Sequence, residues 1–430
     1  MALTFDKLFS EAYNKTIEVY FFNSIRNFKK GDIMVFEKTV LNKALASAFD
    51  ETIEVTYWSG ETEKYGSGET KAHITFNKKF SLSDLAGEPT LVLGEAYMNG
   101  DIEIEGSLQA LISSAYRQKE SFVMDQSGLK GAIAKRLMGS HDKKTSRADI
   151  HSHYDIGNDF YKKWLDPTMT YSCAYFENET MTLQEAQMAK IRHILNKLHS
   201  TPGGRLLDIG CGWGTLLITA AQEYGLSGVG ITLSDEQYAF ATQHIQSLGL
   251  EDKIKIYLMD YRDLKEPEFD YITSVGMFEH VGKENLEAYF QKVADYLKPN
   301  GRALIHGITG QHQGMGIDPF IDKYIFPGGY IPNVAEQITH IMSAGLQLDD
   351  LEPLRRHYQK TLEIWSENYE KVFDETVESM GRPFARMWDL YLQACAAGFE
   401  SGNIDVIQFL ITKGASGQTL PMTRDYIYKK

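Results

Sequence analysis

The chain has 430 residues, a length that predicts two or three domains. Hydrophobic residues make up 43% and charged residues 24% of the chain, the composition of a globular protein that can bury a large core. The formal net charge of −14 disfavours a nucleic-acid partner, because nucleic acids select basic surfaces.

The N-terminal sequence lacks the basic and apolar regions of a signal peptide, and no apolar run is long enough to span a bilayer. The three cysteines, Cys173, Cys211 and Cys395, lie far apart and form no CxxC pair. This spacing argues against a zinc site and against a disulfide framework, and it suits a reducing cytosol. We therefore expect a protein that is soluble or lies on a membrane surface.

Residues 1–127 are expected to form a smaller α+β domain. Apolar residues from Phe9 to Phe21 recur at helical spacing and predict an amphipathic helix. The stretches 53–57 and 73–76 alternate in polarity or are rich in β-formers, and they predict two strands. Asn99-Gly100 is compatible either with a hairpin turn or with the C-cap of a short helix. No catalytic constellation is visible in this region.

Residues 128–150 have the composition of a basic linker. Between positions 129 and 148 the single acid Asp142 is opposed by six basic residues: Lys130, Lys135, Arg136, Lys143, Lys144 and Arg147. Apolar residues between positions 129 and 137 fall on one helical face. Two interpretations stay open, a membrane-surface element and a solvated helix between domains.

Strand and helix patterns alternate from residue 205 onward. Strands are predicted at 205–209, 228–231, 253–259, 269–275 and 302–308. Helices are predicted at 215–223, 236–247 and 283–297. This alternation predicts a doubly wound, Rossmann-like α/β sheet, in which ligands bind at the carboxyl ends of the strands. Five loops lie at that edge, at 208–214, 232–237, 260–262, 276–282 and 306–310.

The stretch 206–214 is an apolar strand that runs into glycines at positions 210, 212 and 214. Glycines let the backbone turn sharply and approach a ligand closely. A dinucleotide loop would need its third glycine at position 215, which is Thr215, and an acid about twenty residues on. Asp208 instead precedes the glycines, so nicotinamide binding is disfavoured. The stretch is typical of the S-adenosylmethionine (SAM) loop of methyltransferases, with an ordinary glycine-rich turn as the alternative.

Further motifs follow one another from residue 151 to near residue 410. They are His153–Asn158, Tyr171–Phe176, Leu207–Gly214, Gly230–Gln237, Asp260–Arg262, Met277–Gly282, His306–Ile308, Tyr324–Tyr330, His357–Trp365 and Cys395-Ala-Ala397. With this set, the chain resembles the cyclopropane-fatty-acid synthase family, which includes the related mycolic-acid methyltransferases. The resemblance implies a class I SAM-dependent methyltransferase domain at residues 151–430. The first domain suggests the bacterial membrane-phospholipid version of the family, although that region matches only loosely.

The resemblance also implies a reaction. SAM carries an electrophilic methyl group, and the acceptor would be the cis double bond of an unsaturated phospholipid acyl chain. Methyl transfer to an alkene leaves a carbocation, so the site must exclude water, stabilise the cation and remove a proton to close a cyclopropane. Aromatic faces stabilise cations by roughly 0.5–2 kcal/mol each. Tyr154, Phe160, Tyr171 and Tyr175 are candidates, although core packing is the better explanation for most of them.

Proton removal is implied to use a bound bicarbonate ion. Glu279 and His306 fall at the ends of adjacent predicted strands, and Tyr358 would reach in from the following region. The backbone of Cys173 and of Ile308 would complete the cluster. Such donors offset the cost of burying a small anion in an apolar cavity. A glutamate beside an anion requires that one of the two is protonated or that His306 intervenes.

Cys395 and Cys211 differ in the roles that we expect for them. Cys395 is sometimes regarded as an active-site thiol in this family, but the reaction requires no covalent enzyme intermediate. We therefore expect Cys395 to line the pocket and to be dispensable. Cys211 lies in the cofactor loop, where its backbone matters more than its sulfur.

The cofactor contacts implied by the resemblance come from four segments. Asp208 would engage the amino-acid end of SAM directly or through water, and polar side chains from Thr232 to Gln237 would replace the usual ribose-binding acid. The complete set is Tyr171, Ser172, Asp208, Gly210, Gly212, Trp213, Gly214, Thr232, Leu233, Ser234, Gln237, Tyr261 and Arg262. No metal site is expected.

The expected partners are unsaturated membrane phospholipids and a second copy of the chain. The first domain would serve in lipid binding or dimerisation, and the enzyme would be cytoplasmic, on the inner face of a bacterial plasma membrane. Two alternatives stay open. One is a SAM-dependent enzyme with another acceptor or with a methyl-branched product; an amine or phenol acceptor would not need Glu279, His306 and Tyr358. The other is a non-catalytic lipid-binding protein.

Overall fold

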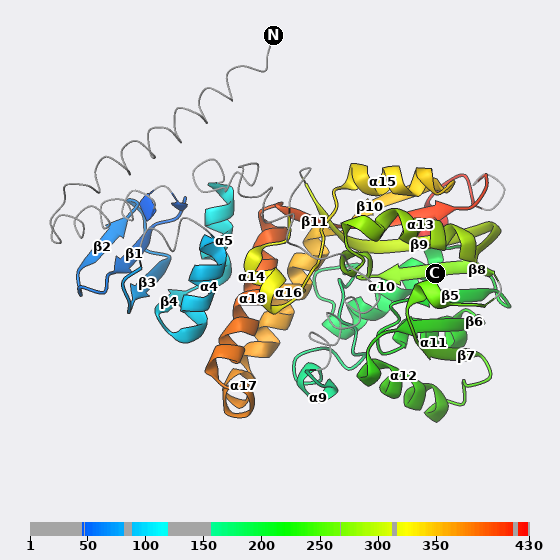
Figure 1. Cartoon of the computed structure of the whole chain (residues 1–430), viewed down its shortest axis with the longest axis horizontal. Coiled ribbons are helices and arrows are strands. Elements are labelled where there is room, and N and C mark those ends of the chain that lie inside the picture. The colour runs from blue at the N-terminus through cyan, green and yellow to red at the C-terminus, as the bar shows by residue number, and fades with distance from the viewer. Residues whose placement is uncertain are drawn as a thin grey trace, which may run out of the picture.

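A computed structural model describes residues 45–46, 48–80, 88–118, 156–266, 268–311, 316–415 and 420–428. Two sheets lie at opposite ends of the elongated molecule, with a layer of helices between them (Figure 1). The predicted first helix, Tyr154 and the basic linker at 128–150 lie outside the described residues.

The larger sheet has seven strands in the order β10-β11-β9-β8-β5-β6-β7. The bounds are β5 Arg205–Ile209, β6 Ser227–Thr232, β7 Ile254–Leu258, β8 Phe269–Val275, β9 Leu297–Gly310, β10 Gln347–Pro353 and β11 Ile404–Thr412. The neighbouring strands β7, β6, β5, β8 and β9 are all parallel to one another. β11 is antiparallel to both of its neighbours, β9 and β10. The five predicted strands are present; β10 and β11, which the sequence analysis did not place, complete the sheet.

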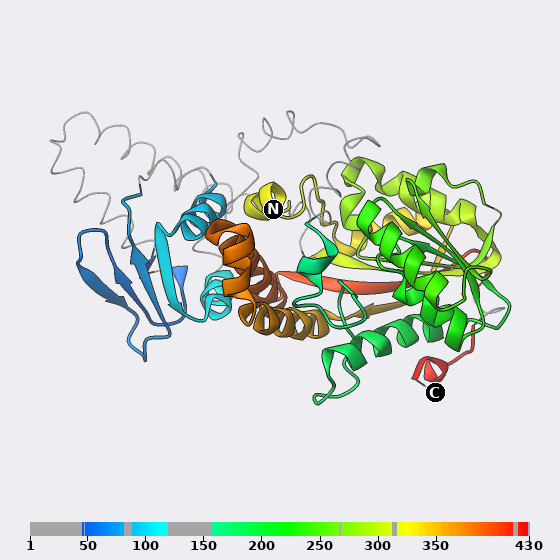
Figure 2. The same cartoon turned by 90° about the horizontal axis from the view of Figure 1, so that it is seen from below.

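Helices cover both faces of this sheet, as the doubly wound prediction requires (Figures 1 and 2). One face packs on α10 (Leu183–Lys197), α11 (Thr215–Glu223) and α12 (Asp235–Ser247). The other packs on α13 (Leu286–Tyr296) and α15 (Val334–Ser343). Leu206 and Leu207 are both fully buried, in the cores on opposite faces, because successive strand side chains point to opposite sides.

A helical layer adjoins the larger sheet. It contains α9 (Asn158–Tyr161), α14 (Pro319–Tyr324), α16 (Arg355–Glu370), α17 (Phe373–Met380) and α18 (Arg382–Glu400). Its core is aromatic: the ring of Trp388 lies 4.9 Å from that of Phe160 and 5.8 Å from that of Trp164, in edge-to-face or tilted geometry. Such pairs add directional packing to the burial of apolar area.

The smaller sheet has the order β2-β1-β3-β4, with β1 and β3 parallel. Its elements are β1 Ile53–Thr56, β2 Thr62–Tyr65, β3 Ala72–Phe76, α4 Pro89–Asn99, β4 Ile102–Gly106 and α5 Leu108–Arg117. Gly100 is left-handed, with φ 78°, and caps α4. The structure therefore resolves the Asn99-Gly100 ambiguity in favour of a helix C-cap.

α18 joins the two parts of the molecule. The Tyr97 hydroxyl donates to Asp389 at 2.8 Å, and the buried Arg386 donates to Glu103 at 2.8 Å and to the carbonyl of Ile102 at 3.0 Å. The Arg386 guanidinium also lies over the Tyr97 ring, 4.1 Å from its centroid. The small sheet and its helices are thus held to α18 by specific polar contacts.

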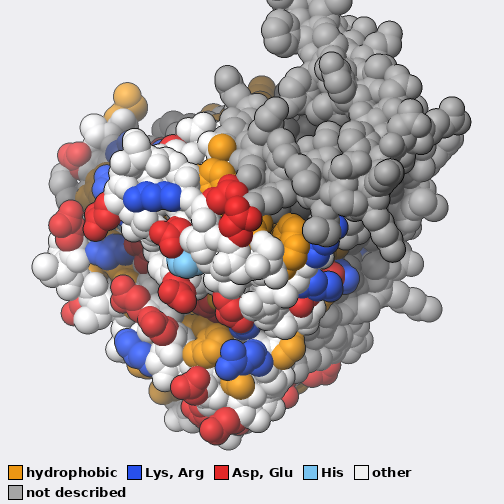
Figure 3. All heavy atoms as spheres, turned by 90° about the vertical axis from the view of Figure 1, so that its left-hand side faces the viewer, with side chains coloured by type: hydrophobic (Ala, Val, Ile, Leu, Met, Phe, Trp, Pro, Cys, Tyr) orange, Lys and Arg blue, Asp and Glu red, His pale blue; other side chains and the backbone are white. Residues whose placement is uncertain are grey.

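The outer end of the molecule, at the small sheet, shows acidic, basic and apolar side chains intermixed on its described surface (Figure 3). Among the described residues, no helix combines the length and the apolar character needed to cross a bilayer.

Candidate active site

The glycine loop connects β5 to α11. Gly210, Gly212 and Gly214 have φ values of 81°, 53° and 88°, a region that side chains strain. The amides of Gly210 and Cys211 both donate to the carbonyl of Ile231 at 2.9 Å, so the loop is tied to the neighbouring strand β6. The loop therefore needs its glycines for conformation as well as for ligand approach.

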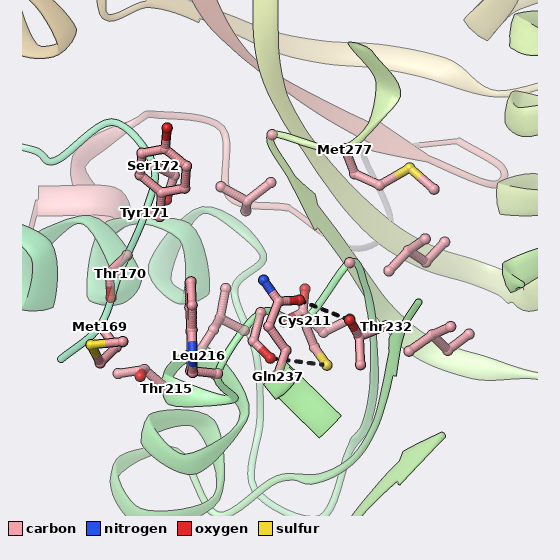
Figure 4. A pocket seen from close by; sticks show the side chains of 18 of the residues that line it. Met169, Thr170, Tyr171, Ser172, Cys211, Thr215, Leu216, Thr232, Gln237 and Met277 are labelled. Atoms are coloured by element: carbon pink, nitrogen blue, oxygen red, sulfur yellow. Dashed lines mark hydrogen bonds between the residues drawn. The ribbon is translucent and has the colours of Figure 1, made fainter. Parts of the chain in front are cut away.

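A pocket opens beside this loop at the carboxyl edge of the sheet (Figure 4). Ten predicted cofactor residues line it: Tyr171, Ser172, Asp208, Gly210, Gly212, Trp213, Thr232, Leu233, Gln237 and Tyr261. The segment carrying Tyr171 and Ser172 faces the glycine loop and β6 across the pocket. The structure thus brings together segments that are far apart in the sequence.

Three predicted cofactor residues are not part of the lining. Gly214 is the N-cap of α11, and Ser234 caps α12 by accepting from the amide of Gln237. The guanidinium of Arg262 is engaged by Asp260 in a two-pronged ion pair, with bonds of 2.7 and 2.6 Å. These residues support the pocket walls.

Other lining residues were not predicted as contacts: Met169, Thr170, Lys190, Ile191, Ile209, Cys211, Thr215, Leu216, Ile231, Met259, Val275, Gly276, Met277 and His280. Five of them, Ile209, Cys211, Gly276, Met277 and His280, belong to loops that were predicted at this edge of the sheet, so topology was the available signal for these. Lys190 and Ile191 lie on α10, which was not predicted to reach this edge, and Lys190 is the lysine of the lining.

Asn158 links the helical layer to the cofactor loop. Its side-chain oxygen accepts from the indole N–H of Trp213 at 2.7 Å, and its amide nitrogen donates to the carboxylate of Glu236 at 2.9 Å. The last residue of the His153–Asn158 motif therefore fixes the segment from 156 onward against both the glycine loop and the start of α12.

Asp208 is a buried carboxyl in the pocket wall. It accepts a hydrogen bond from the Thr273 hydroxyl at 2.8 Å. Burial raises the pKa of Asp208 from 3.8 to about 6, against the opposing effects of Thr273 and of the Lys190 ammonium. Asp208 is thus placed to meet a cation at moderate pH.

Glu279 lies in the 3-10 turn Phe278–His280, just after β8. Its Oε1 accepts from the backbone amide of Ile308 on β9 at 2.6 Å, while the buried Oε2 has no partner among the described residues. Burial raises the pKa of Glu279 to about 7. Two of the predicted catalytic groups, the Glu279 side chain and the Ile308 backbone, are therefore in direct contact.

His306 is buried on β9, two residues before Ile308 and opposite Val275 of β8. Its Nδ1 lies 3.2 Å from the amide nitrogen of Gln408, the residue paired with it on β11. The other ring nitrogen, Nε2, has no partner within the described part of the chain. Gln408 was not predicted, because it lies on a strand that the sequence analysis did not place.

Tyr358, Cys173 and Cys395 join Ile308 and Tyr171 in one apolar cluster. The Tyr358 ring lies 4.7 Å from Phe399, and the Cys173 side chain is fully buried. Burial raises the pKa of the Cys395 thiol to about 12. A thiol held in its protonated form is a poor nucleophile, which agrees with a lining role for Cys395.

The aromatic candidates separate by location. Tyr171 lines the pocket, and its hydroxyl lies 2.6 Å from that of Tyr391. Phe160 is buried in the aromatic core, as the packing interpretation predicts. Tyr175 stacks on His193 and His357, with ring centroids 4.1 and 4.9 Å apart, and is not part of the pocket lining.

Comparison with known proteins extends over most of the chain. The Mycolic acid cyclopropane synthetase family matches residues 141–409, and a domain of unknown function matches residues 40–127. The chain is 41% identical over 345 residues to a probable fatty acid methyltransferase of Pseudomonas putida, covering 78% of this chain and 86% of the relative. It is 37% identical over 353 residues to the cyclopropane-fatty-acyl-phospholipid synthase of Escherichia coli K12, covering 81% and 90%.

Among solved structures, mycolic acid cyclopropane synthase CmaA1 complexed with S-adenosylhomocysteine (SAH) and CTAB matches with a TM-score of 0.60 and 36% identity. The match covers 64% of this chain and 99% of that one. The predicted fold class and SAM as cofactor are thereby confirmed, and the non-catalytic alternative is set aside. The domain bounds 1–127, 128–150 and 151–430 and the individual site residues stay predictions. The chain belongs to the Mycolic acid cyclopropane synthetase family of SAM-dependent methyltransferases.

Proposed function

We propose that this enzyme transfers the SAM methyl group to the cis double bond of a phospholipid acyl chain, then removes a proton so that a cyclopropane closes. One observation carries the proposal. Glu279 Oε2 and His306 Nε2 are both buried without a partner among the described residues. Neither residue lines the cofactor pocket, but His280, next to Glu279 in the chain, and Val275, the strand partner of His306, do. Buried polar atoms without partners are costly, so the pair favours a small polar guest. An amine or phenol acceptor would not require one.

Bicarbonate fits this cluster by its chemistry. When bound, it supplies an oxygen base for the proton that the carbocation loses. Because the pKa of Glu279 is raised to about 7, Glu279 can carry a proton near neutral pH and donate it in a hydrogen bond to an anion. Burial lowers the pKa of His306 well below 6.5, so the ring stays neutral and can exchange donor and acceptor roles.

The surroundings of the cluster suit a carbocation intermediate. Tyr171, Tyr358 and Ile308 belong to the apolar cluster around the buried Cys173. Apolar and aromatic walls exclude the water that would otherwise quench the cation as an alcohol. Tyr171, which also lines the cofactor pocket, is the residue best placed to offer an aromatic face near the transferred methyl group.

The test is an assay with SAM and vesicles of a monounsaturated phospholipid, followed by mass analysis of the released acyl chains. The proposal expects a gain of one methylene with loss of the double bond, and a rate that depends on added bicarbonate. SAM turnover that gives only unsaturated, methylated chains would refute ring closure.

A second candidate is a methyltransferase that forms methyl-branched acyl chains. The similarity to the Pseudomonas putida relative, a probable fatty acid methyltransferase at 41% identity, favours it. Both candidates share the first step and differ in how the cation is resolved. The two products have the same mass, so mild catalytic hydrogenation of the released chains precedes the mass analysis. A branched chain that keeps its double bond then gains two hydrogens, whereas a cyclopropane chain keeps its mass.

The proposal includes a place of action. The acceptor lies within a bilayer, and the basic linker at 128–150 would bring the enzyme to anionic lipid on the inner face of a bacterial plasma membrane. We also propose a homodimer with the first domain taking part in lipid binding or dimerisation. Sedimentation analysis with and without vesicles tests both.

A further inference from the structure

Lys190 is a buried lysine in the wall of the cofactor pocket. Lys190 is 2% exposed, and its Nζ donates to the hydroxyl of Ser172, another lining residue, at 2.6 Å. Among the described residues no carboxylate forms an ion pair with it. A buried ammonium with only a neutral partner is costly, since burial removes its hydration.

Lys197 on the same helix shows the contrast. It is also fully buried, but its ammonium pairs with Glu352 at 2.5 Å and lies 3.5 Å from Asp350. The described part of the chain thus supplies an ion-pair partner for Lys197 and none in direct contact for Lys190. A ligand anion in the pocket would complete the Lys190 site.

The pocket wall also contains a carboxyl group, whose charge is opposite to that of Lys190. Asp208 lines the same pocket and precedes the glycine loop. The amino-acid end of SAM carries one ammonium and one carboxylate, so a wall with one carboxylate and one ammonium matches it in charge. The nucleoside end has no anionic group that would match Lys190.

We propose that Lys190 binds the carboxylate of the methionine portion of SAM, and that the Ser172 hydroxyl orients the ammonium group of Lys190. This inference depends on the cofactor alone. It does not depend on the acceptor or on bicarbonate.

The protonation of Lys190 is compatible with this role. Burial lowers the pKa of Lys190 to about 8, while Cys173, Asp166 and Asp208 act in the opposite direction. The Lys190 charge also adds to the effect of burial in lowering the pKa of His306. In the free protein Lys190 is thus charged at neutral pH and loses its charge in mildly alkaline solution.

The experiment compares two ligands by titration calorimetry: SAH and 5′-methylthioadenosine, which lacks the amino-acid portion. Lys190→Met is expected to weaken SAH binding roughly 10- to 100-fold, as for loss of a charged hydrogen bond. Binding of 5′-methylthioadenosine should stay within about twofold, since it makes no such contact. Lys255→Met, an exposed lysine on β7, is the matched control and should change neither. Equal weakening of both ligands, or an unchanged SAH affinity, would overturn the proposal.

A second measurement avoids any folding defect of Lys190→Met. In the wild type, the preference for SAH over 5′-methylthioadenosine should decline between about pH 7 and 9 as Lys190 loses its proton. In Lys190→Arg, whose charge is permanent, the decline should be smaller, because only the amino group of SAH titrates. The same decline in both proteins would count against Lys190. A vesicle assay without product, together with normal SAH binding, would refute the proposed phospholipid acceptor but would not affect the proposal for Lys190.

Discussion

The Glu279 carboxyl reaches across from the end of β8 to the backbone amide of Ile308 on β9, with 2.6 Å between the two atoms. This bond holds one oxygen of the carboxyl and leaves the other buried and without a partner in the described part of the chain. The carboxyl therefore lies beside β9, the strand that also carries His306.

Glu279→Gln should lower the rate of ring closure by at least about 100-fold, the usual scale for loss of a general acid–base group. The amide keeps the shape but cannot pass a proton to or from a bound base. The measurement is cyclopropane formation on vesicles, with the exposed Glu284→Gln as the control. A Glu279→Gln enzyme with wild-type rates would remove Glu279 from the proposed mechanism.

The same substitution should stabilise the protein at high pH. The pKa of Glu279 is about 7 in the folded protein and 4.5 in the unfolded chain, so between pH 4.5 and pH 7 the folded state binds more protons than the unfolded state. Stability from this group is therefore present at low pH and lost as pH rises through about 7. Glu279→Gln should raise Tm by roughly 2–4 °C at pH 8, and the two proteins should melt together near pH 4.5. A constant difference across this range would contradict the assigned cause.

Cys395→Ala should retain activity within about threefold, because no step needs a covalent intermediate. The pKa of this thiol is raised to about 12, so it should also resist alkylation by iodoacetamide at pH 8. Turnover and mass-detected alkylation are the two measurements. Inactivation of Cys395→Ala with an unchanged Tm would show that the thiol has a role beyond lining the pocket.

Arg386→Met should loosen the small sheet from α18. It removes the bonds to Glu103 and Ile102 and the contact with Tyr97, and it leaves Glu103 without its buried partner. We expect a loss of about 1.5–3 kcal/mol of stability, the usual range for hydrogen bonds to a charged group, because Glu103 is half-exposed and water can solvate its charge. Hydrogen exchange should rise in α4 and β4 before it rises in β5. The exposed Arg382→Met, on the same helix, should have neither effect.

Neutralising Lys135, Arg136, Lys143 and Lys144 together should weaken binding to anionic vesicles, by about 1 kcal/mol for each basic residue at the surface. Binding to neutral vesicles should change little, and added salt should reduce the difference. Cosedimentation with vesicles measures the effect. Unchanged binding to anionic vesicles would exclude the linker as the docking element.

The local sequence determined much of the catalytic fold. β5, β8 and α11 have the predicted bounds, because each is marked by its own apolar pattern and closed by glycines or polar residues. The glycine loop was equally visible, since its positive φ values require glycine. Where two local signals competed, as at Asn99-Gly100, only the packing of α4 against its neighbours decided between them.

Pairing between distant segments was beyond the reach of local patterns. Nothing near Gln408 in the chain predicts that β11 inserts antiparallel beside β9 and brings this side chain to His306. Lys190 and Lys197 are two lysines on one helix, indistinguishable by residue type. In the tertiary structure Lys197 has a carboxylate partner, whereas Lys190 lies in the wall of the cofactor pocket and contacts a hydroxyl. The two differ because the cost of a buried charge depends on what three-dimensional packing places beside it.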